Sequence, residues 1–244
     1  RGFRLANFWM IDFWIAGTLS MSFAAIAPVC ADPLANALPT GGVVSVGSGT
    51  LNQNGNQLTV TQTTNKLSLN WQTFDIGKNA GVTFVQPNVQ SIALKTVQSA
   101  NPSQIYGRLN ANGQIYLVNP NGIVVGPDAT INAAAMILST KTLADADFLA
   151  GRYNFNQQGP SSAAILNQGL LQVKQNGFVT LIGQHLTNVG SIQAPGGTAG
   201  LFAGDTVAVS LSNPAAPATV TTAVAGDARI TNSGTIHAAG GTIQ

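Results

Sequence analysis

Short segments of alternating apolar and polar residues fill the chain from residue 43 onward. The predicted strands are Val43–Val46, Gln57–Gln62, Leu67–Trp71, Val82–Val85 and Ser91–Val97. In Leu67–Trp71 every second side chain is apolar, which is typical of a strand with one buried face. Asn-Gly and Pro-Asn pairs between these segments favour turns. The pattern therefore predicts an all-β protein built from short strands.

The C-terminal third repeats a pattern in which Asn and Gly lie at fixed positions between two apolar residues. The copies place their asparagines at Asn167, Asn188 and Asn232. The spacings are 21 and 44 residues, and we interpret the second as about two periods. A repeat of this length, with Asn and Gly at a constant phase, predicts a β-solenoid with one coil per repeat.

The Asn and Gly residues of this repeat have distinct expected roles. Both residue types tolerate the left-handed backbone conformation at a corner between two short strands. Asparagines in successive coils are also expected to form a ladder of hydrogen bonds. The low charge of the chain favours the same architecture, because coils about 4.8 Å apart would stack like charges on one another.

Two segments interrupt the strand pattern. Residues Met136–Gly151 lack alternation, and their Ala, Leu and Asp content predicts a short helix around Ala144–Leu149 that ends at the nearby glycine. Residues 205–227 contain Pro214 and Pro217 and predict a loop or hairpin outside the repeat. The sequence stops within a repeat, so we expect the chain to be part of a longer solenoid.

The N-terminal segment differs from the rest of the chain. Two arginines precede an apolar run, and small residues suited to signal peptidase follow it. This order predicts a secretory signal over residues 1–37 and a mature domain over residues 38–244. We favour cleavage after Ala37 over cleavage after Ala31. A retained membrane anchor is the alternative, although the run is only mildly apolar. Removal of the signal would also remove Cys30, the only cysteine of the sequence.

Composition excludes several classes of protein. Only 7% of the 244 residues are charged, Glu is absent, and the formal net charge is +2. Long exposed helices depend on Glu, Lys and Arg, so an all-α fold is not expected. Nucleic-acid binders concentrate Lys and Arg on one face, and no basic run occurs in this sequence, so no nucleic-acid partner is expected.

Residues suited to catalysis or metal binding are few. His185 and His237 lie far apart and match no ligand spacing or nucleophile motif. Asp145 and Asp147 are the closest acidic pair, and we interpret them as solvated residues at a helix end. We therefore expect no enzymatic activity, no metal and no cofactor.

The segment Asn119–Ile123 forms an Asn-Pro-Asn-Gly motif directly after the alternating segment Gln114–Val118. Proline fixes φ at the second position of a turn, and Asn-Gly accepts positive φ. The motif predicts a tight, rigid corner between two strands.

Around this corner the sequence resembles the two-partner-secretion domain. That domain begins the filamentous-haemagglutinin-type and high-molecular-weight-adhesin-type exoproteins of Gram-negative bacteria. The resemblance covers about residues 38–244, and the matching segments are Leu38–Gly42, Asn70–Gly77, Asn101–Leu109, Asn112–Ile123 and Asp147–Phe155. It implies a right-handed parallel β-helix with an N-terminal cap and small extra-helical β elements.

The resemblance also implies a secretion motif. The family carries two Asn-Pro-Asn motifs, and the second corresponds to Asn119, Pro120, Asn121, Gly122 and Ile123, with Asn101 and Pro102 upstream. The region of the first motif reads Gln86–Val89 and departs from the family's Asn-Pro-Asn-Leu. This departure places the chain nearer to the adhesin and haem-scavenger branch than to the toxin-delivery branch.

The function implied by the resemblance is that of a secretion domain, recognised by the periplasmic POTRA domains of an outer-membrane β-barrel transporter, which nucleates β-helix folding at the cell surface. The other implied partners are the Sec translocon, signal peptidase and the host-cell surface. The expected location is secreted or cell-surface, reached through the periplasm and outer membrane.

Two alternatives from other classes remain. A direct adhesin that binds host glycans would use the long faces of a solenoid, although aromatic residues make up only 7% of the chain. A solenoid carbohydrate lyase or hydrolase would need convergent charged residues, and Arg108, Arg152 and the Asp residues are dispersed in the sequence.

Overall fold

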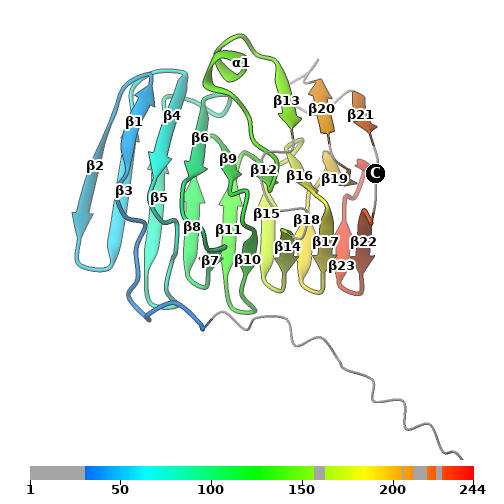
Figure 1. Ribbon diagram of the computed structural model, residues 1–244, viewed down its shortest axis with the longest axis horizontal. Coiled ribbons are helices and arrows are strands. Elements are labelled where there is room, and N and C mark those ends of the chain that lie inside the picture. The colour runs from blue at the N-terminus through cyan, green and yellow to red at the C-terminus, as the bar shows by residue number, and fades with distance from the viewer. Residues whose placement is uncertain (1–30, 157–162, 205, 211–218, 224–226) are drawn as a thin grey trace, which may run out of the picture. The chain divides into compact units, whose positions relative to one another are not determined.

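The computed structural model describes residues 31–156, 163–204, 206–210, 219–223 and 227–244 (Figure 1). The predicted signal up to Cys30 and the prolines Pro214 and Pro217 lie outside these residues. From Asp32 onward the chain forms one unit, which is described below. Within the part of the chain that is described, no helix is long and apolar enough to span a membrane.

Three sheets run along this unit, and each full coil adds one strand to each of them. The first sheet contains, in spatial order, β1 (Val43–Val46), β4 (Lys66–Trp71), β6 (Ile92–Val97), β9 (Gln114–Val118), β12 (Ala135–Ser139), β16 (Phe178–Gly183), β19 (Thr198–Ala203) and β24 (Thr242–Ile243). The second contains β2 (Gly49–Asn54), β3 (Gln57–Gln62), β5 (Gly81–Val85), β8 (Arg108–Ala111), β11 (Thr130–Ala133), β15 (Leu170–Val173), β18 (Ser191–Gln193) and β23 (Thr235–His237). The third contains β22 (Arg229–Asn232), β17 (His185–Asn188), β14 (Ala164–Asn167), β10 (Ile123–Val125) and β7 (Ser103–Ile105).

A fourth, outer sheet is antiparallel and lies outside the coils. It consists of β13 (Tyr153–Asn156), β20 (Thr206–Ser210) and β21 (Thr219–Ala223), and the single described helix is α1 (Asp145–Leu149). The five predicted strands are confirmed with ends within one residue, and so is the short helix. The hairpin alternative for residues 205–227 is confirmed by the antiparallel pairing of β20 with β21.

The strands of successive coils pair in parallel, so the expected parallel β-helix is confirmed. The chain passes from the first sheet to the third, then to the second, and returns to the first sheet one coil further on. In this register Asn188 pairs directly with Asn232. Our interpretation of the 44-residue spacing as two periods is therefore wrong. The spacing is one coil enlarged by the segment that carries β20 and β21.

The expected asparagine ladder is confirmed. Asn167 Nδ2 donates to Asn188 Oδ1 at 2.7 Å, and Asn188 Nδ2 donates to Asn232 Oδ1 at 2.7 Å. Asn167 Oδ1 is buried and has no hydrogen-bond partner among the described residues, because Val125 occupies the same register position in the preceding coil. The ladder therefore begins at Asn167.

The predicted left-handed conformation at these corners is wrong. Among the described residues, Asn176 is the one non-glycine with a positive φ, so Asn167, Asn188 and Asn232 do not have one. The glycines of the repeat, Gly169, Gly190 and Gly234, do not have a positive φ either. Glycine is required at these three corners because the backbone of the neighbouring coil approaches too closely for a Cβ atom. A Cβ on Gly190 would lie 2.2 Å from Gly169 O, and one on Gly234 would lie 2.1 Å from Gly190 O.

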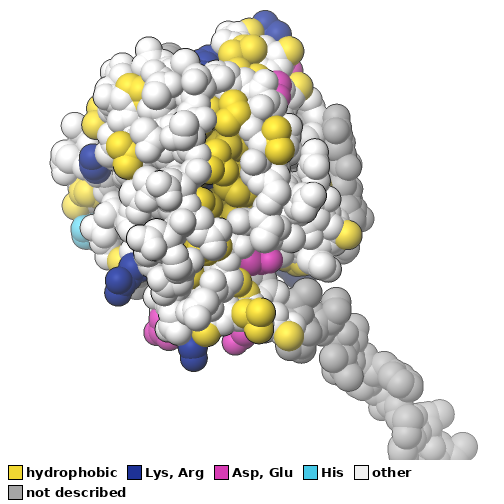
Figure 2. Space-filling view, turned by 90° about the vertical axis from the view of Figure 1, so that its left-hand side faces the viewer, with side chains coloured by type: hydrophobic (Ala, Val, Ile, Leu, Met, Phe, Trp, Pro, Cys, Tyr) yellow, Lys and Arg dark blue, Asp and Glu magenta, His cyan; other side chains and the backbone are white. Residues whose placement is uncertain are grey.

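The N-terminal end of the β-helix is closed by antiparallel strands. Strand β1 pairs with β4, and β2 pairs with β3, whereas β3 and β4 begin the parallel ladders. This arrangement is the expected N-terminal cap. Figure 2 looks onto this end and shows apolar side chains between polar edges. Leu38, Val44 and Leu51 are partly buried here against the core.

The outer sheet and α1 create a second hydrophobic core on the outer face of the first sheet. Tyr116, Phe148, Tyr153 and Phe178 belong to this core, and Tyr116 packs edge-on to Tyr153 at 5.7 Å between ring centroids. Strand β12 is consequently buried on both faces. This burial explains why the sequence from Met136 lacks alternation although it begins with a strand.

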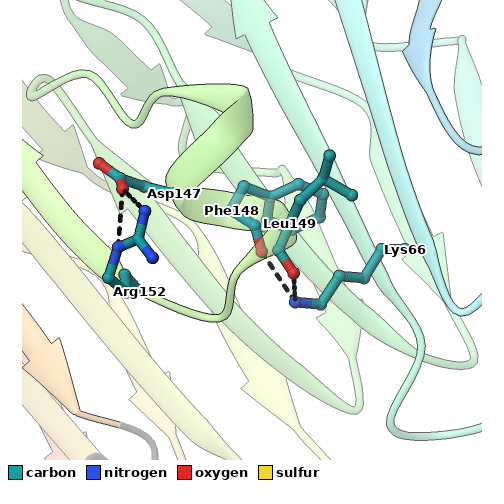
Figure 3. A network of polar contacts seen from close by, with 5 residues as sticks. All are labelled: Lys66, Asp147, Phe148, Leu149 and Arg152. Atoms are coloured by element: carbon teal, nitrogen blue, oxygen red, sulfur yellow. Dashed lines mark hydrogen bonds and ion pairs between the residues drawn. The ribbon is translucent and has the colours of Figure 1, made fainter.

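Helix α1 is held against strands that lie far away in the sequence. Lys66 Nζ on β4 donates to the carbonyl oxygens of Phe148 and Leu149 at 2.8 and 2.9 Å (Figure 3). Asp147 accepts two hydrogen bonds from Arg152, the shorter at 2.7 Å. Asp145 accepts hydrogen bonds from Ser45 Oγ and Ser68 Oγ at 2.8 and 2.7 Å. Our interpretation of both aspartates as solvated residues is therefore wrong. Asp145 connects α1 to β1 and β4, and Asp147 connects it to Arg152, which follows the helix.

The residues before Leu38 contact the first coil. Gly77 N donates to Ala37 O at 2.9 Å, and Asn79 N donates to Ala35 O at 2.8 Å. Cleavage after Ala37 stays a prediction, and it would place both carbonyl groups on the released segment, so the domain would lose these two hydrogen bonds.

Candidate secretion-motif corner

The Asn-Pro-Asn-Gly motif forms the corner between β9 in the first sheet and β10 in the third. Gly122 N donates to Asn119 O at 3.1 Å and closes a four-residue turn. Gly122 has a φ of 120°, a conformation that L side chains rarely adopt. The tight corner expected from the sequence is present.

The Asn119 side chain is fully buried and fixes this corner from inside. Its Nδ2 donates to Asn101 O at 3.1 Å and to Ser103 Oγ at 3.0 Å. Its Oδ1 accepts a hydrogen bond from Asn121 N at 2.9 Å. The backbone N of Asn119 donates to Ser139 O in the next coil at 2.9 Å. The side-chain amide therefore connects the corner to the preceding coil, and the backbone N–H connects it to the next coil; only the first connection requires an amide side chain.

The upstream segment Asn101-Pro102 lies directly beside the motif. Asn121 Nδ2 donates to Ser99 O at 2.7 Å, and Asn101 N donates to Ser99 Oγ at 2.9 Å. A Cβ on Gly122 would lie 3.4 Å from the Pro102 side chain. The structure thus brings all the predicted site residues into one cluster.

Exposure divides this cluster into two groups. Asn101 is exposed, and Pro102, Pro120 and Asn121 are half-buried, whereas Asn119, Gly122 and Ile123 are buried. A partner of the folded domain could touch only the first group. The second group is accessible to a partner only before the coils form.

A similar corner occurs at Gln86, where the sequence departs from the family motif. The Gln86 side chain is 4% exposed, and its Nε2 donates to Ser91 O at 2.9 Å and to Gln62 Oε1 at 3.1 Å. Its Oε1 accepts from Gly113 N at 3.0 Å. A buried amide before Pro-Asn therefore fixes this corner as Asn119 fixes the other. The shared amide-Pro-Asn order was the signal that could have revealed it.

The remaining chemically capable residues do not converge. His185 Nε2 lies 3.0 Å from Asp227 Oδ2 at the surface, and the hydrogen bond from His185 lowers the pKa of Asp227 below its usual range. His237 lies on β23 in a different sheet. No group of three or more His, Cys, Asp or Glu residues with metal-binding proximity occurs in the described ranges.

Residues 35–244 match the family model of the TPS secretion domain, and the chain therefore belongs to this family of two-partner-secretion domains. The solved HMW1 secretion domain from Haemophilus influenzae has the same fold, with a TM-score of 0.79 and 35% sequence identity. That match covers 84% of this chain and 55% of the solved chain. The family is one of secretion domains and not a family of enzymes.

The chain is also similar to part of two longer proteins. Heme/hemopexin-binding protein of Haemophilus influenzae is 36% identical over 162 residues, which make up 64% of this chain and 18% of the relative. A second heme/hemopexin-binding protein of Haemophilus influenzae is 37% identical over 114 residues, which make up 47% of this chain and 12% of the relative. The chain thus spans less than a fifth of these relatives. Exoproteins with this domain are secreted through an outer-membrane transporter.

Proposed function

We propose that this chain directs a larger adhesin-type exoprotein to its outer-membrane transporter. The signal segment takes the chain through the Sec translocon, signal peptidase removes it, and the POTRA domains of the transporter bind the secretion domain in the periplasm. The domain then reaches the cell surface. The observation that carries this proposal is the match of residues 35–244 to the secretion-domain family.

The proposed recognition step takes place before the β-helix is complete. The buried residues Asn119 and Ile123 are accessible only in an extended chain. An extended segment with high β-propensity and low charge can add as a strand to the sheet edge of a receptor. The POTRA domains would therefore bind the motif and release it to fold.

The proposed folding step begins at the cap and proceeds coil by coil. Asn119 connects its own coil to the coils before and after it through Asn101 O and Ser139 O. Each later coil stacks on a finished neighbour, so folding outside the cell can proceed by nearest-neighbour contacts. No nucleotide cofactor is required for this step.

Secretion of residues 1–244 from a Gram-negative host, with and without the two-partner transporter, tests this proposal. We expect the chain in the medium only when the transporter is present. The N119A/N121A variant should be secreted at a level at least tenfold lower. Asn132→Ala is the matched control, because Asn132 is exposed on β11 and outside the corner. Retention of the wild-type chain in the periplasm despite a functional transporter would contradict the proposal.

Refolding distinguishes the two roles of the motif. If N119A/N121A refolds from urea like the wild type but is not secreted, the motif acts in recognition. If the variant neither refolds nor appears in the medium, it acts in folding. Full secretion of the variant would remove both roles.

A further inference from the structure

Two adjoining hollows lie on the outer face of the second sheet. The first has a volume of about 400 Å³ and is lined by residues that include Lys78, Arg108 and Asn110. The second has a volume of about 330 Å³ and is lined by residues that include Asn110, Asn132 and Lys174. Asn110 lines both hollows, which lie across β5, β8 and β11, and we refer to the two together as the groove.

The cations of this groove have no carboxylate partners. Lys78, Arg108 and Lys174 are exposed, and none of them forms a salt bridge with a described residue. Among the other exposed Lys and Arg side chains of the described ranges, Arg152 is paired with Asp147, which leaves Arg229 on the third sheet. No Asp lines either hollow. On a chain with so few charges, this groove concentrates the unpaired positive charge.

Uncharged hydrogen-bonding groups lie in register between the cations. Thr83, Asn110, Asn132 and Gln172 occupy the same position in four neighbouring strands. Their amides and hydroxyls can both donate and accept hydrogen bonds. Phe84, which also lines the groove, is 1% exposed, so the groove offers no aromatic platform.

The spacing of the cations indicates an extended ligand. Arg108 is in register with Thr130 and Leu170, and Lys174 follows Leu170 by four residues. From the strand spacing and rise, Arg108 and Lys174 are separated by roughly 10 Å along the coil axis and roughly 13 Å along the strands. A ligand that contacts both must run diagonally across the sheet.

We propose that this groove binds a linear polysaccharide of uronic acids. The polymer carries one carboxylate on every sugar, so a chain that spans the groove can place a carboxylate beside each of the three cations, and its hydroxyls can pair with the amide row. Arg108 can bind a carboxylate through two parallel hydrogen bonds. Nucleic acid fits less well, because its bases favour aromatic stacking, for which the groove offers no exposed ring. Binding is a property of the folded domain and does not depend on the proposed secretion route.

Titration of the purified 244-residue chain with polygalacturonate oligomers tests this inference. We expect saturable binding that weakens as NaCl rises, because exposed charges are screened. The K78A/R108A/K174A variant should bind at least tenfold more weakly. Asn110→Asp should also weaken binding, because it places a negative charge in the middle of the groove. Circular dichroism establishes that each variant is folded.

Matched controls distinguish a polysaccharide site from a simple positive patch. Arg229→Ala removes the same charge as Arg108→Ala from another sheet and should leave the affinity unchanged. Polyglutamate carries carboxylates without sugar hydroxyls and should bind at least tenfold more weakly than polygalacturonate. Absence of polygalacturonate binding, equal binding of polyglutamate, or equal losses in R108A and R229A would each overturn the inference.

Discussion

Lys95 lies inside the β-helix among apolar side chains. In the register of the first sheet it is flanked by Leu69 and Leu117, and it is fully buried. Its Nζ donates to Ala93 O at 3.2 Å and lies 4.2 Å from the centroid of the Phe84 ring. Burial lowers the pKa of Lys95 well below its usual value. The folded domain therefore disfavours the charged form of this side chain, whereas the unfolded chain accepts it.

This difference predicts that the domain becomes more stable as the pH rises. The unfolded state binds more protons than the folded state below the ordinary lysine pKa, so the free energy of unfolding should increase from pH 7 to pH 9 by up to about 1.4 kcal/mol per pH unit. Lys95→Met should raise stability at pH 7 by roughly 1–4 kcal/mol and flatten this slope. Urea unfolding at both pH values measures the effect. An unchanged slope in the variant would show that Lys95 is not its origin.

The asparagine ladder operates at the scale of strands. Asn188 both accepts from one neighbour and donates to the other, whereas Asn232 lies at the end of the described ladder. Asn167 and Asn188 are fully buried, whereas Asn232 is exposed, so only the first two depend on the ladder for their hydrogen bonds.

We therefore predict that Asn188→Ala costs more stability than Asn232→Ala. Asn188→Ala leaves the buried Asn167 Nδ2 without an acceptor, which costs about 1–3 kcal/mol, whereas water can reach the amide that the loss of the exposed Asn232 leaves open, so the difference should fall in this range. Chemical denaturation of both variants measures it, with Thr187→Ala as a control on the same strand. Equal losses for the two asparagines would indicate that the ladder contributes little.

The hydrogen bonds from Lys66 to the end of α1 also act between elements. Lys66 Nζ satisfies two carbonyl oxygens at the end of the helix and lies 5.5 Å from the centroid of the Phe148 ring. Lys66→Met should therefore remove both bonds, leave Phe148 O with Gly151 N as its partner, and loosen α1 from the first sheet, with a loss of roughly 0.5–1.5 kcal/mol. Hydrogen exchange of Phe148 and Ala150 amides should accelerate in the variant. The exchange of β9 amides serves as the internal reference and should change little.

The strand pattern predicted much of the fold because each coil repeats the same alternation. The ladder also followed from the sequence, since Asn recurs at one phase. The role of the glycines did not, because left-handed backbone and close approach both select Gly, and only the coil spacing distinguishes them. The 44-residue interval was misleading for a similar reason, since an inserted hairpin and a second coil add nearly the same length.

The candidate site was predictable in part. Asn119–Ile123 specifies a turn by local chemistry, so its geometry could be inferred from five residues. The contact of Asn119 Nδ2 with Asn101 O spans 18 residues and depends on the coil period, which the sequence did not define in this region. The role of Gln86 was not predicted, because Gln differs from the Asn of the family motif in length, although both side chains end in the same amide group.

At the scale of the whole molecule, stability is propagated from coil to coil. Contacts join each coil to its neighbours, and the glycine corners allow them to approach. Such a molecule can lose its last coils while its first coils remain folded. A Cβ placed at one corner should therefore destabilise the coils after that point and leave the coils before it folded.

We predict that Gly190→Ala increases hydrogen exchange in β17, β18 and the strands after them, while β4, β6 and β9 stay protected. Gly234→Ala should move the boundary one coil further, because its clash is with Gly190 O. Exchange mass spectrometry of the two variants locates each boundary. Uniform loss of protection in either variant would show that the domain unfolds as a single cooperative unit.

The two extra-helical segments leave the β-helix at the same corner. Helix α1 and β13 lie between β12 and β14, and β20 with β21 lie between β19 and β22, so both insertions separate a strand of the first sheet from one of the third. The register of the flanking strands continues across both. Because the entropic cost of closing a loop rises only slowly with its length, this corner can accept inserted sequence at little cost in stability. Sequence added to either existing insertion would extend the outer layer, while the parallel pairing of the flanking strands keeps the coils in register.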